Sequence, residues 1–363
     1  MHQLGISIYP EHSCENQDFT YMELAAKYGF QRIFTCLLSV GKPVEQIIDE
    51  FSRFTGKAHE LGFTVTADTN PAVFKYLGAT PSDLGAFAEI GLDILRLDGN
   101  FGEREDRIIT HNPYDIKIEF NGSSDTNLEH LIRHGANPRN MLVCHNFYPQ
   151  RYTGLSWKTF MGFNRKWNAL GLHTAAFVSS NNRNTFGPWP VSAGLPTLEA
   201  HRGLPVDLQV RHMLACEVID DILVGNAYAT EEELAAMSRV DFTKTTVRVD
   251  PEAGISEEER RILFDCDHAG RTDASEYFIR SSLTRIEHNG RSIPARSCGK
   301  RVFTRGDIVI VNDHLEHYRG ELEVILRDTP NAGERNLAGC IPEAEMMILD
   351  QIEEKVDHLF GFI

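Results

Sequence analysis

Polar side chains recur in this sequence at the ends of short apolar runs. The residues at these positions are Tyr9, Asp68, Asp98, Glu119, Asn121, His145, Asn146, Tyr148, the segment Ser179 to Arg183, and Asn226. Positions filled by chance in turns would hold more Gly, Ser and Thr. Three carboxylates, a histidine and several amides instead form a set suited to moving protons and holding a polar ligand. The set predicts an active site built from the ends of several strands.

Glu119 carries the strongest signal of a functional role. It interrupts the apolar run DIKIEFN, and period-two alternation places it on the same strand face as Lys117 and Asn121. A buried charged Glu is costly unless it is paired or used. We therefore expect Glu119 to act in the site.

Three other candidates each have a structural alternative. Asp68 precedes the sequence TNP and is either a site carboxylate or the N-cap of the next helix. Asp98 lies in LRLDGNFGE, where Asp-Gly also indicates a turn. His145 is either a core histidine or, as the polar and aromatic loop after it favours, part of the pocket lining.

A long loop at residues 181–203 is rich in Pro, Gly and Asn. Loops of this length in compact domains usually have a function or are disordered. Trp189 has prolines on both sides, which predicts an ordered wall on which a sugar ring could stack. Glu199 is a fourth carboxylate candidate. Alternatively, it lies in the first turn of a helix before Arg202, where its negative charge only favours the helix dipole.

Arginines in these loops could hold an anion. Arg151, Arg183 and Arg202 could clamp a phosphate or a carboxylate through paired hydrogen bonds, and we expect at least one of them to do so. Arg280, followed by two serines, is a similar candidate in the last third of the chain, although it also fits an ordinary strand edge.

Eight short β-rich runs, each followed by a helix-like segment, must position these residues. The runs are 4–10, 32–38, 63–68, 94–99, 116–121, 141–147, 173–179 and 221–227. Glycines that fit helix C-caps precede several of them, at Gly29, Gly62, Gly91, Gly135 and Gly171. About eight such units in roughly 235 residues predict an α/β fold, a (β/α)8 TIM barrel with its site at the carboxyl ends of the strands. A doubly wound sheet is less favoured because no GxGxxG follows the first run.

The pattern changes near Asp241. Strand-like runs at 243–250, 277–286, 300–313 and 320–328 then follow one another with turn residues between them. This succession predicts a small β-rich domain. We place the barrel at residues 1–238 and the second domain at 239–363.

Charge and composition restrict the partners. A net charge of −16 at pH 7 argues against nucleic acid but permits a small anionic substrate held by local arginines. The seven cysteines show no CxxC spacing, so neither a disulfide framework nor a zinc finger is expected, and we predict no metal or cofactor. No apolar run reaches the roughly 20 residues of a membrane span, and no signal peptide is recognised. We expect a cytoplasmic protein without membrane contacts, and its oligomeric state stays open.

Seven stretches of the chain resemble the bacterial 6-phospho-N-acetylmuramidases. They are GISIYPEHS, TADTNP, LRLDGNFG, IEFNGS, CHNFYPQRYTGLS, GPWPVSAGLPTLEAHR and ILVGNAYA, within residues 4–228. The resemblance implies a TIM barrel followed by a cyclophilin-like domain over 241–363. It also implies an intracellular glycosidase that separates N-acetylmuramic acid 6-phosphate from N-acetylglucosamine during cell-wall recycling.

The strand-end carboxylates could supply what glycoside hydrolysis needs. The reaction takes an acid for the leaving oxygen and a second group for the oxocarbenium-like centre. We expect Glu119 to be the general acid or base and Asp68 to be the nucleophile or to orient the substrate. If the acetamide of the sugar is the nucleophile, Asp68 or Asn121 would hold it. Arg151, Arg183, Arg202 or Arg280 would bind the 6-phosphate or the lactyl carboxylate.

Three other functions stay open at this point. A Schiff-base aldolase would use Lys117, which shares a face with Glu119. A metal-dependent sugar-phosphate isomerase would use Asp98, Glu119 and His145 as ligands, although no close spacing such as HxH supports it. A non-catalytic protein would bind the phosphosugar without turnover.

Overall fold

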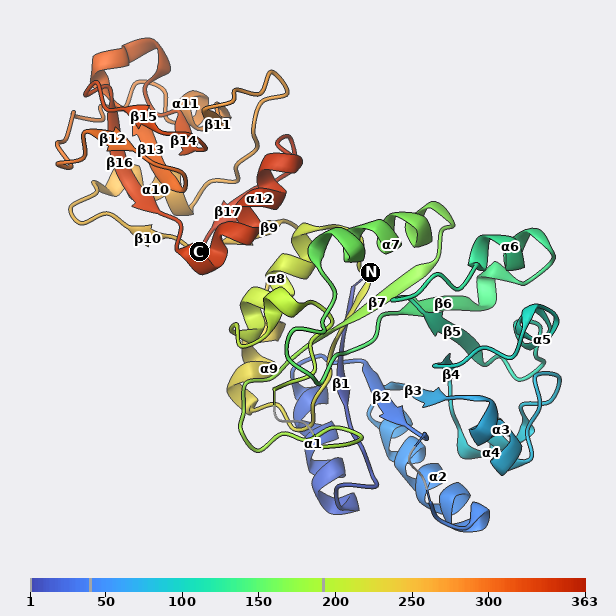
Figure 1. Ribbon diagram of the computed structural model, residues 1–363. Coiled ribbons are helices and arrows are strands. Elements are labelled where there is room, and N and C mark those ends of the chain that lie inside the picture. Colours follow the sequence, from blue (N-terminus) through green and yellow to red (C-terminus); the bar gives the residue numbers. More distant parts are fainter. Residues whose placement is uncertain (1, 39–40, 191–192) are drawn as a thin grey trace. The chain divides into compact units, whose positions relative to one another are not determined.

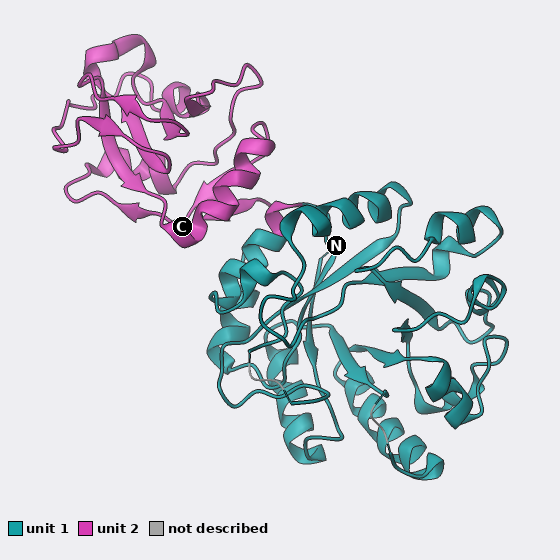
Figure 2. Ribbon diagram, in the orientation of Figure 1, with its two compact units in different colours: residues 1–213, 217–240 teal, residues 214–216, 241–363 magenta. Residues whose placement is uncertain are grey.

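The chain forms two compact units. The structure, a computed structural model, describes residues 2–38, 41–190 and 193–363. Contacts within the chain group residues 1–213 with 217–240 in one unit, and residues 214–216 with 241–363 in the other (Figure 2). In the described part, no helix is long and apolar enough to cross a membrane.

The first unit is a closed barrel of eight parallel strands (Figure 1). The strands are β1 (Gln3–Ser7), β2 (Arg32–Cys36), β3 (Thr64–Thr69), β4 (Ile94–Leu97), β5 (Lys117–Asn121), β6 (Met141–Cys144), β7 (His173–Val178) and β8 (Asp221–Val224). Each strand pairs with the next one along the chain, and β8 closes the barrel by pairing Asp221 with Gln3 of β1. The predicted (β/α)8 fold is therefore confirmed, with one strand in each of the eight runs.

Helices lie around the barrel and return the chain to the next strand (Figure 1). They are α1 (Glu15–Lys27), α2 (Val44–Glu60), α3 (Pro71–Leu77), α4 (Gly85–Ile90), α5 (Glu103–Ile109), α6 (Leu128–Arg133), α7 (Trp157–Ala169), α8 (Val206–Ala215) and α9 (Glu231–Ser238), with the short 3-10 turns η1 (Pro138–Asn140) and η2 (Glu199–His201). The predicted glycines Gly29, Gly62, Gly91, Gly135 and Gly171 all have positive φ angles. That conformation ends a helix at little cost only when no Cβ is present.

An aromatic cluster fills the barrel near the carboxyl ends of its strands. Phe34 of β2 and Phe177 of β7 pack edge to face with ring centroids 5.0 Å apart, and Phe147 lies 5.1 Å from Phe177. Phe34 and Phe177 are almost fully buried. These rings form a rigid, closely packed layer beneath the loops that follow the strands, because close-packed aromatic side chains leave little free volume.

The second unit is built on a five-stranded sheet with the order β10-β16-β13-β14-β11, in which all neighbours are antiparallel. Its strands and those of two smaller sheets are β9 (Thr245–Val247), β10 (Asp250–Pro251), β11 (Phe278–Ser281), β12 (Val302–Phe303), β13 (Asp307–Val311), β14 (Leu322–Ile325), β15 (Thr329–Pro330), β16 (Arg335–Cys340) and β17 (Phe360–Phe362). The other elements are α10 (Glu257–Phe264), α11 (Leu283–Glu287), α12 (Met346–Glu354), η3 (Asp313–Tyr318) and η4 (Glu343–Glu345).

The expected β-rich character of this region is confirmed, with one local correction. The run 277–286 was expected to be a strand, but only its first part forms β11, and α11 begins at Leu283. The Thr284 hydroxyl donates to the carbonyls of Ser281 and Gly320. Such side-chain to backbone bonds stabilise a turn at this point, and alternation of residue types does not reveal them.

Candidate active site

Arg96 joins two carboxylates at the carboxyl ends of β3 and β4. Its Nη1 lies 2.6 Å from Oδ1 of Asp68 and 3.6 Å from Oδ1 of Asp98. Its Nη2 donates a short hydrogen bond to the side-chain oxygen of Asn146, which follows β6. Asp68 is almost completely buried, whereas the side chain of Asp98 is 45% exposed. One guanidinium thus holds a buried and an exposed carboxylate together.

Burial raises the pKa of Asp68 to about 6, against the lowering effect of Arg96, and the negative charges of Asp98 and Glu119 raise it further. Only its Oδ1 has a hydrogen bond within the described part of the chain, so Oδ2 is left to carry a proton or meet a ligand. The N-cap alternative does not hold, because Asn70 caps α3 by accepting from the backbone N–H groups of residues 72 and 73. Asp68 therefore has the acidity of a group that can donate a proton near neutral pH.

Glu119 lies inside the barrel and is fully buried. Its Oε1 accepts a hydrogen bond of 2.5 Å from Arg32, which also donates to Asp221 over 2.8 Å and to the Thr66 hydroxyl over 3.1 Å. Arg32 and Asp221 are the first residues of their strands, so this network extends toward the amino-terminal end of the barrel. Active sites of TIM barrels lie at the opposite end. Glu119 is thus paired with Arg32 through one oxygen in the barrel interior, in register with Arg96, and its predicted role in the site stays a prediction.

His145 also lies in the core. It is fully buried, Nε2 is 3.1 Å from the Asn164 side-chain oxygen, and Nδ1 is 3.2 Å from the Ser123 hydroxyl. Burial lowers the pKa of His145 to about 4, the bond to Asn164 opposes this, and the positive charge of Arg96 lowers it further. The imidazole is therefore neutral at physiological pH and fixes the start of the loop, while its neighbour Asn146 accepts from Arg96, which contacts both carboxylates.

The loop after β6 is held by an ion pair between Glu199 and Arg202. Arg202 donates to both carboxylate oxygens of Glu199, over 2.8 and 2.7 Å, and to the carbonyl of Tyr148 over 3.0 Å. Glu199 accepts in addition from the backbone N–H groups of Tyr152 and Gly154. A Cβ on Gly154 would lie 2.6 Å from the backbone nitrogen of Glu199, so the approach requires glycine. Hydrogen bonds from Arg202, opposed by burial and supported by the backbone donors, lower the pKa of Glu199 to about 2.

Next to this ion pair lies a cavity of about 440 Å³ lined by arginine, serine and asparagine side chains. Arg151, Arg183 and Arg202 line it together with the segment 179–182. Arg202 is engaged by Glu199, but no hydrogen bond or ion pair involves Arg151 or Arg183 within the described ranges. The structure therefore brings the three arginines together, and two of them keep their guanidinium donors for a ligand.

Two side chains, the buried Asn226 and the half-buried Glu233, shape the wall of this cavity. Asn226, after β8, uses its side-chain amide to bind the backbone of Ser180 and the hydroxyl of Thr185. Glu233 of α9 accepts from the Ser180 hydroxyl over 2.6 Å and from the Asn181 backbone over 2.8 Å. Asn226 thus positions the loop and, with all these bonds made, does not face a ligand itself.

The remaining candidates are divided between the core and the surface. Tyr9 is buried and donates a hydrogen bond of 2.6 Å to the carbonyl of Gly225. Asn121 is buried and accepts from the backbone of Ser123. Tyr148 is half buried, with no hydrogen bond to its hydroxyl among the described residues. Trp189 is 40% exposed, and its ring centroid lies 6.2 Å from that of Phe147.

Arg280 belongs to the second unit. It lies on β11, and its guanidinium is 3.5 Å from a carboxylate oxygen of Asp273. The serines that follow it are also engaged, since Ser281 binds His268 and Ser282 donates to Glu321. Acidic neighbours make this position less suited to an anion than the cavity in the barrel unit.

Ligand-type side chains come together in the described ranges only at Cys266, Glu287 and His288 of the second unit. Asp98, Glu119 and His145, the ligands of the isomerase alternative, form no such group. Lys117, the residue of the aldolase alternative, lies 3.7 Å from Asp115 and is 40% exposed. The geometry of the barrel unit therefore favours proton transfer by carboxyl groups over either alternative.

Sequence reasoning missed Arg32, Arg96 and Glu233. The two arginines interrupt the buried strands QRIFTC and ILRLDG in the same way that Glu119 interrupts its strand. The rule that a buried charge must be paired or used would have selected them together with Glu119. Glu233 has a visible local signal, the capping box that it forms with Thr230, but nothing local indicates its bonds to the loop at 180–181.

The structure is a closed (β/α)8 barrel, and a carboxyl pair and an arginine-lined cavity lie at the carboxyl ends of its strands. These features define the class as a TIM barrel with a candidate site of carboxyl groups and arginines. Comparison with family models gives a match to "6-phospho-N-acetylmuramidase, N-terminal" over residues 4–239 and to "6-phospho-N-acetylmuramidase, C-terminal" over residues 245–361. The chain belongs to the 6-phospho-N-acetylmuramidase family, whose name is that of a glycosidase.

Solved structures share the fold of the whole chain. An uncharacterized protein from B. cereus is 38% identical, with a TM-score of 0.90 over 100% of this chain and 99% of that chain. A conserved protein of unknown function from Enterococcus faecalis is 24% identical, with a TM-score of 0.70 over 99% of this chain and 96% of that chain, and shows the fold alone. No curated protein matches the chain.

Proposed function

We propose that this protein hydrolyses the β-1,4 bond between N-acetylmuramic acid 6-phosphate and N-acetylglucosamine, in the cytoplasm, during peptidoglycan recycling. The family name supports the reaction class. The observation that carries the proposal is the pair of carboxyl groups on Arg96, one with its pKa raised to about 6 by burial and one exposed. Glycoside hydrolysis needs two such groups with different roles.

Asp68 acts as the general acid in this proposal and protonates the leaving oxygen. Asp98 is the second carboxylate and meets the developing positive charge on the sugar. One oxygen of each carboxylate lies near the same nitrogen of Arg96, at 2.6 and 3.6 Å, so the two oxygens are no more than about 6 Å apart and can act on one glycosidic bond. This assignment moves the acid from Glu119, which is paired with Arg32, to Asp68.

The arginine-lined cavity, formed by the loops after β6 and β7 at the same end of the barrel as the carboxyl pair, binds the anionic part of the substrate. Its two arginines without protein partners, Arg151 and Arg183, would grip the 6-phosphate or the lactyl carboxylate through paired hydrogen bonds. A volume of about 440 Å³ falls in the range of small-molecule sites. The exposed ring of Trp189 is available for stacking on a sugar face. The free hydroxyl of Tyr148 is available for a hydrogen bond to the substrate.

Product release from two disaccharides tests the proposal. The purified chain receives N-acetylmuramic acid 6-phosphate–N-acetylglucosamine or the same disaccharide without phosphate, and free N-acetylglucosamine is measured. Cleavage that depends on the phosphate and is lost in Asp68→Asn and Asp98→Asn supports it. Asp115→Asn is the control, because the side chain of Asp115 is 97% exposed. Phosphate-dependent binding without cleavage would instead identify a phosphosugar-binding protein.

A further inference from the structure

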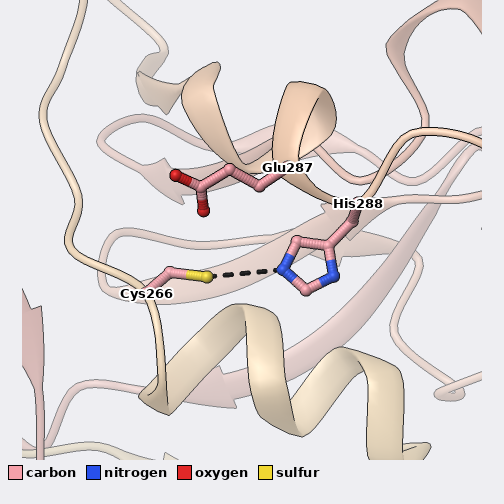
Figure 3. A group of neighbouring side chains, drawn as sticks. All are labelled: Cys266, Glu287 and His288. Atoms are coloured by element: carbon pink, nitrogen blue, oxygen red, sulfur yellow. Dashed lines mark hydrogen bonds between the residues drawn. The ribbon is translucent and has the colours of Figure 1, made fainter.

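Three side chains with metal-ligand atoms meet in the second unit, far along the chain from the carboxyl pair. Cys266 follows α10, Glu287 is the last residue of α11, and His288 comes directly after it. The thiol sulfur, a carboxylate oxygen and an imidazole nitrogen all lie within 4.8 Å of one another (Figure 3). Cys266 and His288 are partly buried, and Glu287 is exposed.

The distance between sulfur and nitrogen fits a tetrahedral metal centre. Cys266 Sγ is 3.4 Å from His288 Nε2. Two ligands of Zn²⁺, at about 2.3 Å for sulfur and about 2.0 Å for nitrogen, are separated by about 3.5 Å when the angle at the metal is tetrahedral. The thiol and the imidazole therefore already stand at the separation that the ion requires. The exposed side chain of Glu287 can rotate to bring a carboxylate oxygen to the same ion as a third ligand.

The imidazole is oriented by a second carboxylate. His288 Nδ1 forms a short hydrogen bond with Oε1 of Glu258, which leaves Nε2 to face Cys266. Arg291 donates to both oxygens of Glu258, over 3.1 and 2.9 Å, and fixes that carboxylate. A carboxylate on the outer nitrogen of a metal-bound histidine is the usual support of such a ligand, because it sets the tautomer and the ring plane.

We propose that Cys266, Glu287 and His288 bind a zinc ion, with Glu258 as the positioning residue of His288 and a fourth coordination position open to water. Thiolate, imidazole and carboxylate together favour zinc over calcium or magnesium. The acidic side chains of residues 265 and 267 add negative charge that favours a cation. The ion ties the end of α10 to the end of α11.

Binding must release one proton from the thiol. The metal–sulfur bond forms as the S–H bond breaks, and the proton goes to solvent. Apparent affinity therefore rises with pH, because the thiol must lose its proton.

Cobalt(II) titration of the full chain, freed of metal by a chelator and kept reduced, tests this proposal. We expect one equivalent to bind with a thiolate-to-cobalt charge-transfer absorption, and zinc to displace it. Cys266→Ser should abolish the absorption, while Cys340→Ser, which changes an exposed cysteine of the same unit, should keep it. Glu258→Gln should keep the absorption but weaken the affinity by about 10- to 100-fold.

Two results would overturn the proposal: no charge-transfer absorption in the unaltered chain, or an absorption that survives Cys266→Ser. Cys266 and His288 would then be a hydrogen-bonded pair without a metal. Circular dichroism of each variant shows that the unit is folded, so a missing signal cannot come from unfolding. The readout is the metal absorption, so it is independent of whether the barrel hydrolyses a sugar.

Discussion

Asp68 accepts a hydrogen bond of 2.6 Å from Arg96, and yet the pKa of its carboxyl is raised to about 6. An ion pair with arginine ordinarily lowers a carboxyl pKa, but desolvation of this buried group outweighs the attraction. Arg96 thus positions Asp68 without making it a permanently charged carboxylate. The combination is what a proton donor at the mouth of a barrel requires.

The pH dependence of hydrolysis should reveal this acid. Asp68 must carry a proton to act, and its protonated fraction falls tenfold for each pH unit above its pKa of about 6. We expect kcat/KM to decline with that slope on the alkaline side, as a profile of initial rates would show. A rate that stays constant from two units below to two units above this value would contradict the role of Asp68.

Glu119 should stabilise the folded barrel. Glu119→Gln removes one partner of a buried ion pair and leaves Arg32 with Asp221 alone, so we expect a loss of roughly 3–5 kcal/mol in the free energy of unfolding. Urea denaturation measures it. The control Glu129→Gln removes an exposed ion pair with Arg133 and should cost no more than about 1 kcal/mol. Equal effects of the two variants would show that the barrel network is not what stabilises this unit.

Arg183 should determine affinity for the phosphorylated substrate. Arg183→Gln keeps a polar side chain but removes the charge and the guanidinium donors, so we expect KM for the 6-phosphate disaccharide to rise about tenfold or more, with a smaller change in kcat. Arg104→Gln, at a side chain that is 75% exposed in an outer helix, should change neither. A drop in kcat alone would place Arg183 at the reacting bond and away from the phosphate.

Gly154 should be intolerant of a side chain. In Gly154→Ala the new Cβ would meet the backbone of Glu199 at 2.6 Å, so the loop must shift, and we expect a loss of about 1–3 kcal/mol together with a higher KM. Gly162→Ala, in the interior of α7 with open space around it, should instead stabilise the chain by about 0.5–1 kcal/mol. Thermal melting of both variants distinguishes the steric effect of a Cβ at Gly154 from the gain in helix propensity at Gly162.

The barrel could be predicted from the sequence because its signals are local. Each β-rich run and each glycine at a helix end is readable within a few residues, as Gly29 and Gly62 show. The grouping of Arg151, Arg183 and Arg202 was also anticipated, because loops after strands meet at one end of a barrel.

The partners inside the site could not be predicted in the same way. Which strand-end carboxylate pairs with an arginine depends on the register of neighbouring strands, and that register puts Asp68 beside Arg96 and Arg96 beside Glu119. Arg32 of β2, three strands away, then forms an ion pair with Glu119 inside the barrel. Alternation shows that Glu119 points inward, but it does not show at what depth or beside which cation.

The central claim is that Asp68 protonates the leaving group, and an activated substrate tests it most directly. Asp68→Asn is assayed on the phosphorylated disaccharide and on an aryl glycoside of N-acetylmuramic acid 6-phosphate, whose phenolate leaves without a proton. Loss of about 10²–10⁴-fold on the disaccharide with a much smaller loss on the aryl glycoside is the predicted result. Equal losses on both substrates would contradict the account, because Asp68 would then serve a step that does not depend on the leaving group.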